Sequence, residues 1–289
     1  MATASLSGCV VAITGGARGI GLATARAFVA AGAKVAIGDL DLALAEHAVG
    51  KLTSDVVALP LDVTSWQSFS EFINGAQAAL GPLDVLVNNA GVMLTGEFLA
   101  EPPAITDAMI AVNLAGVLHG CKLAAAAFAE RGRGSIVNVA SMAGTAGFPG
   151  VATYCATKFG VIGLTYALRE ELRTQGIAVS AVLPGIVHTE LSSGLKLPGV
   201  VEKFVSTEPQ NIAEAVLAVT RSGRALAHVP RRMKWVLRVA SAMPERPRRF
   251  LGRVSRTERV YLAVDQAVRD EYHARAADRS GVERFELFD

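Results

Sequence analysis

Tyr154 and Lys158 are the residues whose types and spacing most directly suggest chemistry. On a helix, side chains four positions apart project from the same face, so a phenol and an ammonium group can reach one point. A tyrosine with a pKa of about 10 needs a shift of roughly 3 units to work near pH 7, and a neighbouring positive charge in a desolvated cleft favours such a shift. Ser141 ends the apolar run SIVNVAS, where a strand would bring a hydroxyl to the same cleft. The YxxxK spacing alone also occurs on ordinary surface helices, so its meaning depends on the rest of the chain.

A glycine-rich turn near the N-terminus predicts a phosphate-binding site. The apolar run CVVAIT is followed directly by the pattern TGxxxGxG, with Gly15, Gly19, Ile20 and Gly21, and then by an Ala-rich stretch typical of a helix. Strand, glycine turn and helix in this order place the N–H groups of a helix N-terminus beside a bound anion. The glycines let the backbone approach a pyrophosphate and let the helix pack closely on the strand. No GK[ST] follows, which argues against a nucleoside-triphosphate loop.

The elements that would position these residues alternate along the chain. Apolar, strand-like runs lie at 9–14, 34–38, 56–61, 84–88, 135–140, 177–183 and 225–229. Ala-rich helical stretches lie between most of them, at 19–31, 41–53, 65–80, 104–131, 152–175 and 209–222. Continuous apolar strands that alternate with helices predict an α/β fold, a doubly wound parallel sheet of the Rossmann type with helices on both faces. Residues 190–208 interrupt the pattern with Gly, Pro and Ser.

Six motifs, in this order along the chain, resemble the short-chain dehydrogenase/reductase family. They are Thr14-Gly15-xxx-Gly19-Ile20-Gly21, Asn88-Asn89-Ala90-Gly91, Asn113, Ser141, Tyr154-xxx-Lys158 and Pro184-Gly185-xxx-Thr189. The resemblance covers roughly residues 5–230 and implies seven strands in the order 3-2-1-4-5-6-7. It also implies a mobile lid over the substrate at 190–208 and a homo-oligomer, either a dimer or a tetramer. We therefore expect a nucleotide-binding and catalytic domain at 1–230 and a basic helical extension at 231–289.

The resemblance assigns a catalytic role to four side chains. Tyr154 is the general acid and base, Lys158 lowers the tyrosine's pKa, and both are expected to contact the cofactor near its nicotinamide ribose. Ser141 holds the carbonyl or alcohol oxygen. Asn113 holds a water that links Lys158 to bulk solvent, and a structural amide between helices is the alternative, because a buried amide needs partners. The expected reaction is direct hydride transfer between a nicotinamide cofactor and a lipophilic secondary alcohol or its ketone.

Asp39 indicates which nicotinamide cofactor the chain prefers. It ends the second strand about twenty residues after the glycine loop, where a carboxylate can accept both hydrogen bonds of an adenosine ribose and repel the 2′-phosphate of NADP. Leu40 follows, where an NADP-selective relative would often have arginine. Arg18 in the glycine loop favours the opposite choice. NAD is the expected cofactor and NADP the alternative, and Asp39 could also cap the next helix.

The other expected cofactor contacts follow strands three, four and six. They are Asp62 and Val63, then Asn89, Ala90 and Gly91, then Pro184, Gly185, Val187 and Thr189. Asp62 resembles the family's adenine contact, and capping of the helix that begins near Ser65 is its equal alternative. Asn89 is expected to brace the neighbouring strand. By resemblance, the backbone of Val187 and the hydroxyl of Thr189 hold the nicotinamide carboxamide, whereas His188 is a lid residue that points to solvent.

Composition restricts the class of protein further. The chain has 289 residues and is 51% hydrophobic, which suits a large core. Its cysteines (Cys9, Cys121 and Cys155) are odd in number and lack paired spacing, which indicates a reducing compartment, and MATASLSG lacks a secretion signal, so we expect a cytoplasmic protein. Cys155 is expected to be a buried helix residue, with an oxidation sensor as the alternative. The histidines lack metal-ligand spacing, so no metal site is expected.

Basic residues are concentrated near the C-terminus. Residues 224–259 hold eleven Lys and Arg against Glu245 and Glu258, although the net charge of the chain is only +2. Within RRMKWVLRVASAM a basic amphipathic helix is expected before Pro244, with a further helical pattern from Glu258. Its expected apolar positions are Met233, Val236, Leu237, Ala240 and Met243. Such a helix either packs on the catalytic domain or a second subunit, which we favour, or lies at an anionic membrane surface through 231–256. No nucleic-acid partner is expected, because no reading motif is present.

The substrate does not follow from the sequence. The expected pocket walls at 92–100, 142–151 and 190–205 are apolar and contain no diagnostic polar anchor. A 3-oxoacyl-thioester reductase is the alternative enzyme, and it would more often prefer NADPH. A nucleotide-binding scaffold without turnover is the alternative of another class, but a pure binder has no need of the serine and tyrosine.

Overall fold

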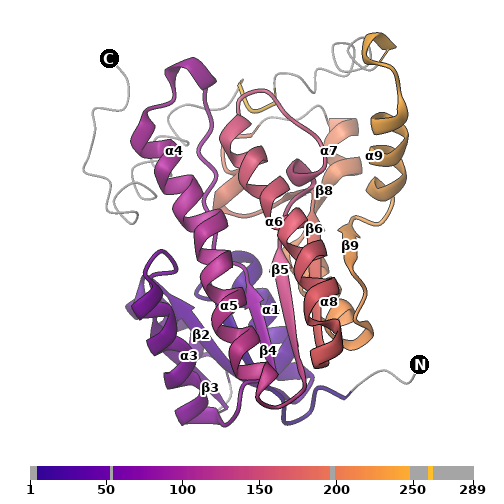
Figure 1. The fold of residues 1–289 in the computed structure, drawn as a ribbon. Helices are drawn as coiled ribbons and strands as arrows, with labels where there is room; N and C mark the ends of the chain where they lie inside the picture. The colour runs from indigo at the N-terminus through magenta and orange to yellow at the C-terminus, as the bar shows by residue number, and fades with distance from the viewer. Residues whose placement is uncertain (1–4, 53–54, 196–198, 248–259, 263–289) are drawn as a thin grey trace.

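The computed structural model of the protein describes residues 5–52, 55–195, 199–247 and 260–262. Its main sheet has seven parallel strands in the order β3-β2-β1-β4-β5-β6-β9, which confirms the predicted doubly wound fold and strand order (Figure 1). The strands are β1 (Val10–Thr14), β2 (Lys34–Asp39), β3 (Val56–Pro60), β4 (Val85–Asn88), β5 (Gly134–Val139), β6 (Ile177–Pro184) and β9 (Leu226–Val229).

Helices cover both faces of this sheet. One layer contains α3 (Trp66–Leu80), α5 (Gly116–Ala129) and α6 (Ala152–Leu172), and α5 and α6 cross the near face in Figure 1. The other layer contains α1 (Gly19–Ala30), α2 (Leu42–Val49) and α8 (Pro209–Ser222). Side chains alternate between the two faces of a strand, so Ala12 of β1 enters the first core and Val11 and Ile13 enter the second. Burial on both faces explains why the strands are continuously apolar.

The long helix expected at 104–131 contains an irregular turn. It begins as α4 (Pro103–Ile110), widens into a π-helical turn at Ala111–Ala115 and continues as α5. Within the described chain, Pro103–Ala129 is long and apolar enough to cross a membrane by length and composition, but its α5 part lines the core through Val117 and Phe128. Turns of the π type often lie at functional sites, and this one contains Asn113.

The interrupted stretch at 190–208 has more regular structure than its composition suggests. After β6 the chain forms β7 (Ile186–Val187), a short 3-10 turn at Glu190–Ser192, α7 (Gly199–Val205) and β8 (Ser206–Thr207). Strands β7 and β8 pair in parallel as a second, two-stranded sheet. Strands of two residues are too short to produce a periodic pattern, which is why the sequence does not reveal them.

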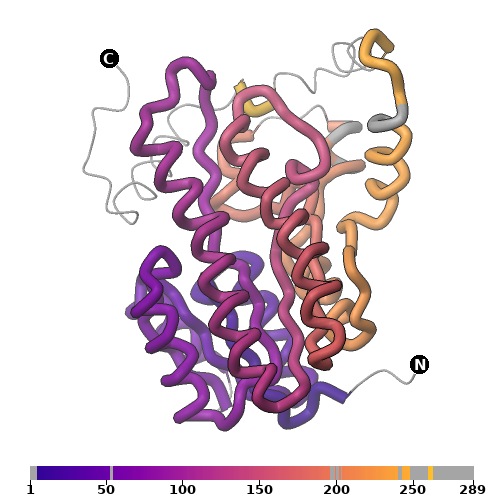
Figure 2. Tube along the Cα trace, viewed as in Figure 1, coloured from indigo at the N-terminus to yellow at the C-terminus, as the bar shows by residue number. Residues whose placement is uncertain are grey.

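The basic helix of the extension is present as α9 (Met233–Ala242), and it ends before Pro244 as predicted. Figure 2 shows residues 233–239 of this helix in orange at the edge of the molecule. Met233 is buried, but Val236 is 40% exposed and its neighbours Trp235 and Val239 are 65% and 59% exposed. Of the expected apolar face, Met233 is therefore buried, Leu237 is half-buried and Val236 is exposed. The helical pattern predicted from Glu258 lies almost entirely outside the described residues.

Candidate active site

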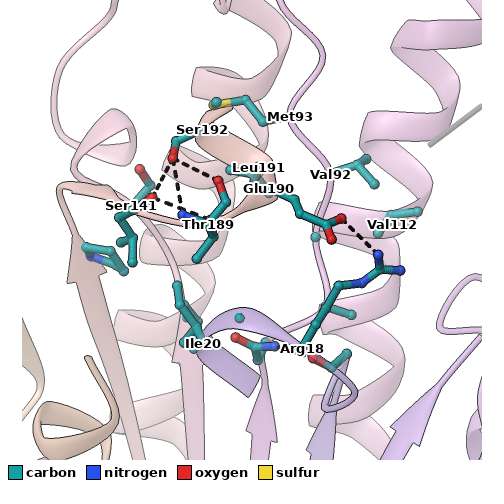
Figure 3. A pocket seen from close by; sticks show the side chains of 18 of the residues that line it. Arg18, Ile20, Val92, Met93, Val112, Ser141, Thr189, Glu190, Leu191 and Ser192 are labelled. Atoms are coloured by element: carbon teal, nitrogen blue, oxygen red, sulfur yellow. Dashed lines mark hydrogen bonds and ion pairs between the residues drawn. The ribbon is translucent and has the colours of Figure 1, made fainter. Parts of the chain in front are cut away.

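A cleft of about 990 Å³ lies at the carboxyl ends of the parallel strands, where open α/β sheets bind ligands. It is lined by every expected site residue except Gly21 and Asn113, and Figure 3 shows several of these side chains. Those residues are Gly15, Arg18, Gly19, Ile20, Asp39, Leu40, Asp62, Val63, Asn89, Ala90, Gly91, Ser141, Tyr154, Lys158, Pro184, Gly185, Val187 and Thr189. Residues that are far apart in sequence thus form one continuous surface.

The glycine loop brings a helix N-terminus to this cleft. Helix α1 begins at Gly19, and its N-cap residue Arg18 supplies no side-chain hydrogen bond to the first turn. The loop is held against β4 because Asn89 Nδ2 donates to the carbonyls of Thr14 and Gly15, each at 2.9 Å. A Cβ atom at Gly21 would lie 2.1 Å from the Gly15 oxygen, so only glycine permits this turn. The uncapped N–H groups and the tight loop fit a dinucleotide pyrophosphate.

Asp39 lies at the edge of the cleft and is almost fully buried. Its carboxylate accepts hydrogen bonds from the N–H groups of Ala17 at 3.1 Å and Asp41 at 3.2 Å. The N-cap of α2 is Asp41, which accepts from Leu44 N at 3.0 Å, so the capping alternative for Asp39 is wrong. Strand β2 ends at Asp39 and helix α2 begins at Leu42, so the capping position falls on Asp41, two residues after the strand end.

At α3, too, the helix is capped by a residue that follows the expected one. Ser65 caps α3 by accepting from Ser68 N at 3.2 Å, so the capping alternative for Asp62 is also wrong. Instead, Asp62 accepts from the N–H and hydroxyl of Thr64 at 2.9 and 2.7 Å. These bonds hold the carboxylate in a tight turn beside the cleft.

An ion pair that the sequence did not predict spans the cleft. Arg18 of the glycine loop contacts Glu190 at 2.9 Å, as the dashed line in Figure 3 shows. The two residues are 172 positions apart, and no local pattern connects them. The pair directs the Arg18 guanidinium toward the 3-10 turn at Glu190–Ser192 and offsets its positive charge.

Tyr154 and Lys158 lie on one face of α6, and both are buried. Lys158 Nζ is 5.6 Å from the centroid of the Tyr154 ring and donates to the carbonyl of Val139, at the end of β5, at 3.1 Å. Burial lowers the pKa of Lys158 from 10.5 to about 8. The ammonium group is thus held close to the phenol, in surroundings where its charge acts strongly.

Ser141 follows β5 directly and lines the cleft beside this pair. Its Oγ accepts a hydrogen bond from Ala143 N at 3.1 Å and caps the short 3-10 turn at Met142–Gly144. Because the oxygen accepts this bond, the O–H group is available to donate a hydrogen bond to a substrate oxygen.

Asn113 lies behind the cleft and is fully buried. Its Oδ1 accepts a hydrogen bond from Val92 N and its Nδ2 donates to the Val92 carbonyl, each at 2.8 Å. Nδ2 also donates to Thr157 Oγ1 of α6 at 3.4 Å, so Asn113 links the loop after β4 to two helical segments. A Cβ atom at Gly91 would lie 3.1 Å from Asn113 Oδ1 and 3.6 Å from Lys158 Nζ. The amide therefore has a structural role and lies close to the lysine, and the water relay stays a prediction.

The segment after β6 closes the other side of the cleft. Thr189 forms a capping box with Ser192, and both side chains bond the carbonyl of Val187. His188 is about half exposed and lies 3.9 Å from Glu208 at the surface. The hydroxyl of Thr189 is thereby held within the wall of the cleft.

The substrate end of the cleft is apolar. Expected walls supply Val92, Met93, Leu191 and Leu195, but Tyr261 of the C-terminal extension also lines it. Nothing in the pattern of the extension places this tyrosine near the catalytic residues. Cys155 is buried in the adjoining apolar cluster, and burial raises the pKa of its thiol, which favours the structural role over an oxidation sensor.

These features define a class of protein: a Rossmann-type dehydrogenase whose acid–base groups lie inside the nucleotide-binding domain. The sequence pattern of the family described as short chain dehydrogenase matches residues 9–197, and the chain belongs to this family. It is an oxidoreductase that acts on CH–OH groups, in a family that uses NAD or NADP.

Two relatives and one solved structure illustrate the similarity. The 2-(S)-hydroxypropyl-CoM dehydrogenase 3 of Xanthobacter autotrophicus is 42% identical over 193 residues, which cover 66% of this chain and 75% of the relative. A 2,5-dichloro-2,5-cyclohexadiene-1,4-diol dehydrogenase of Sphingobium indicum is 36% identical over 207 residues, 71% of this chain and 82% of the relative. A 3-ketoacyl-(acyl-carrier-protein) reductase from Brucella melitensis, solved with NADH, has a TM-score of 0.71 and 29% identity and covers 78% of this chain and 98% of its own.

Proposed function

We propose that the protein interconverts a lipophilic secondary alcohol and its ketone with NAD as cofactor. The observation that supports this most directly is the buried Tyr154–Lys158 pair at the apolar end of a cleft whose other end fits a dinucleotide. When bound, NAD would supply the hydride acceptor, and NADH the hydride donor.

Each catalytic side chain has a defined task in this scheme. Ser141 donates a hydrogen bond from its hydroxyl to the substrate oxygen and fixes its position beside Tyr154. In the oxidative direction Tyr154, as phenolate, takes the proton of the alcohol oxygen while the C–H bond breaks and the C=O bond forms. In the reductive direction the phenol returns that proton. Lys158 stabilises the phenolate through its buried positive charge, and Asn113 holds the loop that shapes this region.

The preference for NAD rests on the charges around the adenosine end of the cleft. Asp39 places a carboxylate there, and Leu40, which follows it, is uncharged and 48% exposed. Arg18 would attract a 2′-phosphate, but it is engaged by Glu190. A carboxylate at this end of the cleft, together with an arginine whose charge is balanced by Glu190, favours the ribose diol of NAD over the 2′-phosphate of NADP.

A 3-oxoacyl-thioester reductase is the second candidate, because the Brucella neighbour has that name and a similar fold. An activity assay of the purified protein separates the two candidates. The substrates are secondary alcohols, sterols, long-chain alcohols and 3-oxoacyl thioesters, each tested with the NAD and the NADP form of the cofactor, and turnover is read from the absorbance of NADH or NADPH. Turnover of alcohols with NAD supports the proposal. Turnover of thioesters alone, with NADPH, would refute it, and the absence of any turnover would indicate a nucleotide-binding scaffold.

We propose further that the catalytic domain spans 1–230 and works as a homo-oligomer in the cytoplasm, whose reducing conditions suit three free cysteines. For α9 we propose contact with an anionic membrane surface through its exposed side, in addition to the packing of Met233. Its exposed Trp235, Val236 and Val239 adjoin exposed basic residues, including Lys234 and Arg238. An exposed apolar strip bordered by positive charge fits an anionic lipid interface.

A further inference from the structure

We propose that Tyr261, from the C-terminal extension, forms a wall of the substrate pocket and selects alcohols with an apolar group of limited size. The inference rests on the proposed function, because it concerns the substrate of the same site.

Tyr261 belongs to the catalytic cleft and to its apolar packing. It lines the cleft together with Ser141 and Tyr154. It also packs against the buried cluster that contains Met93 and Tyr154. Its ring meets the ring of Phe148 edge-on, with centroids 5.9 Å apart and planes at 62°. A tyrosine that lines the cleft and is held by an aromatic neighbour is placed to contact the substrate.

The segment around Tyr261 is docked closely on the loop before α6. Val260 is 5% exposed, whereas Leu262 is 42% exposed on the outer side. A Cβ atom at Gly150 would lie 3.0 Å from the Leu262 Cδ2 atom and from the carbonyl carbon and oxygen of Tyr261, so glycine allows this close approach. The yellow segment in Figure 1 is this part of the chain. Close backbone contact and a buried valine fix the position of the tyrosine.

This wall lies outside the part of the chain that the family shares. The family match ends at residue 197, and the Brucella reductase is covered over 98% of its length while it covers 78% of this chain. A residue at 261 can therefore give this chain a substrate preference that the shared fold does not determine. An aromatic wall next to Met93 and Leu195 favours apolar groups, since a polar group without a partner is costly to bury.

Tyr261→Ala tests the wall, with Tyr166→Ala as the matched control, because Tyr166 is 48% exposed on α6 and is not among the residues that line the cleft. Activity is measured on secondary alkanols of increasing chain length with NAD. The short alkanols that fill the wild-type pocket should show a KM raised about tenfold, longer or branched ones should improve, and the KM for NAD should not change. Tyr166→Ala should behave as wild type. An unchanged order of substrate preference in Tyr261→Ala would overturn the proposal.

Gly150→Ala provides a second perturbation that leaves the pocket side chains intact. Its Cβ would displace residues 260–262, so the preference should shift in the same direction as in Tyr261→Ala. Gly132→Ala is the control. Gly132 has a positive φ of 63°, as Gly150 has one of 85°, but an added Cβ at Gly132 would have nothing within 4 Å. Equal effects of the two glycine variants would show that backbone strain, and not Tyr261, causes the change.

A binding measurement separates failure of this inference from failure of the proposed function. Unreactive primary alkyl amides offer a carbonyl oxygen to Ser141 and Tyr154, and their binding to the NADH complex is read from thermal shifts. If wild type oxidises no alkanol, the proposed function fails, yet a changed chain-length profile of amide binding in Tyr261→Ala still supports the wall. If wild type turns over alkanols and both profiles are unchanged, only the wall fails. A wild type that binds no amide would overturn the wall as well, because the pocket must accept an apolar ligand.

Discussion

Lys158→Met should make the protein more stable at neutral pH and, at the same time, inactive. The lysine is 4% exposed and keeps a charge that its surroundings disfavour, as its pKa of about 8 indicates. Methionine has a similar length and no charge, so it can fill the same space. Loss of activity is expected because Tyr154 would lose the neighbouring charge that favours its phenolate form.

The size of the gain follows from two opposing effects. A pKa lowered from 10.5 to about 8 corresponds to a cost of about 3 kcal/mol for keeping the charged group buried at pH 7. The variant also loses the hydrogen bond from Lys158 to the Val139 carbonyl, which contributes about 1 kcal/mol. The difference leaves a net gain of about 2 kcal/mol in the free energy of unfolding.

Urea unfolding of both proteins across a pH series measures this difference. The folded pKa lies below the unfolded one, so between about pH 8 and 10.5 the folded state binds fewer protons and wild-type stability rises with pH. The advantage of Lys158→Met should therefore be largest below pH 8 and shrink toward pH 10.5. Lys122→Met, on the exposed face of α5, is the control and should change little. A Lys158→Met protein that is less stable than wild type at pH 7 would refute this reasoning.

Two further predictions concern the cofactor and the extension. Asp39→Ala should raise the ratio of kcat/KM for NADP to that for NAD about tenfold or more, because it removes a charged acceptor of the ribose hydroxyls. Glu190→Gln, which removes the partner of Arg18, should raise the same ratio by a few-fold at most, since the pair is partly exposed; a wild type that already prefers NADP would show that Arg18 outweighs Asp39. Liposome co-sedimentation should show binding that increases with anionic lipid, decreases with salt and weakens in Trp235→Ala. Full-length protein that ignores anionic liposomes at low salt would instead identify α9 as a packing surface between subunits.

Residues on one element could be placed from sequence because their spacing fixes their geometry. Tyr154 and Lys158 are four positions apart on a helix, and the glycine loop lies between a strand and a helix whose directions it determines. The doubly wound sheet followed for the same reason, since buried parallel strands must be continuously apolar.

Features that depend on the packing of distant segments could not be placed in this way. The Arg18–Glu190 pair and the position of Tyr261 arise where separate loops meet over the cleft, and no periodicity encodes such meetings. The alternative of a capping role for Asp39 and Asp62 was wrong for a smaller reason. Several residues that can cap lie within a few positions of each strand end, and the local turn of the backbone decides which one reaches the helix.

The central claim is that Tyr154 transfers the proton while a nicotinamide cofactor exchanges the hydride, and Tyr154→Phe tests it most directly. The ring keeps its packing beside Lys158 and only the hydroxyl is removed. With a secondary alcohol and NAD, kcat should fall at least about 100-fold, within the range of general acid–base catalysis, while NADH binding, read from its fluorescence, stays nearly unchanged. Retention of most of the wild-type turnover in Tyr154→Phe would contradict the mechanism.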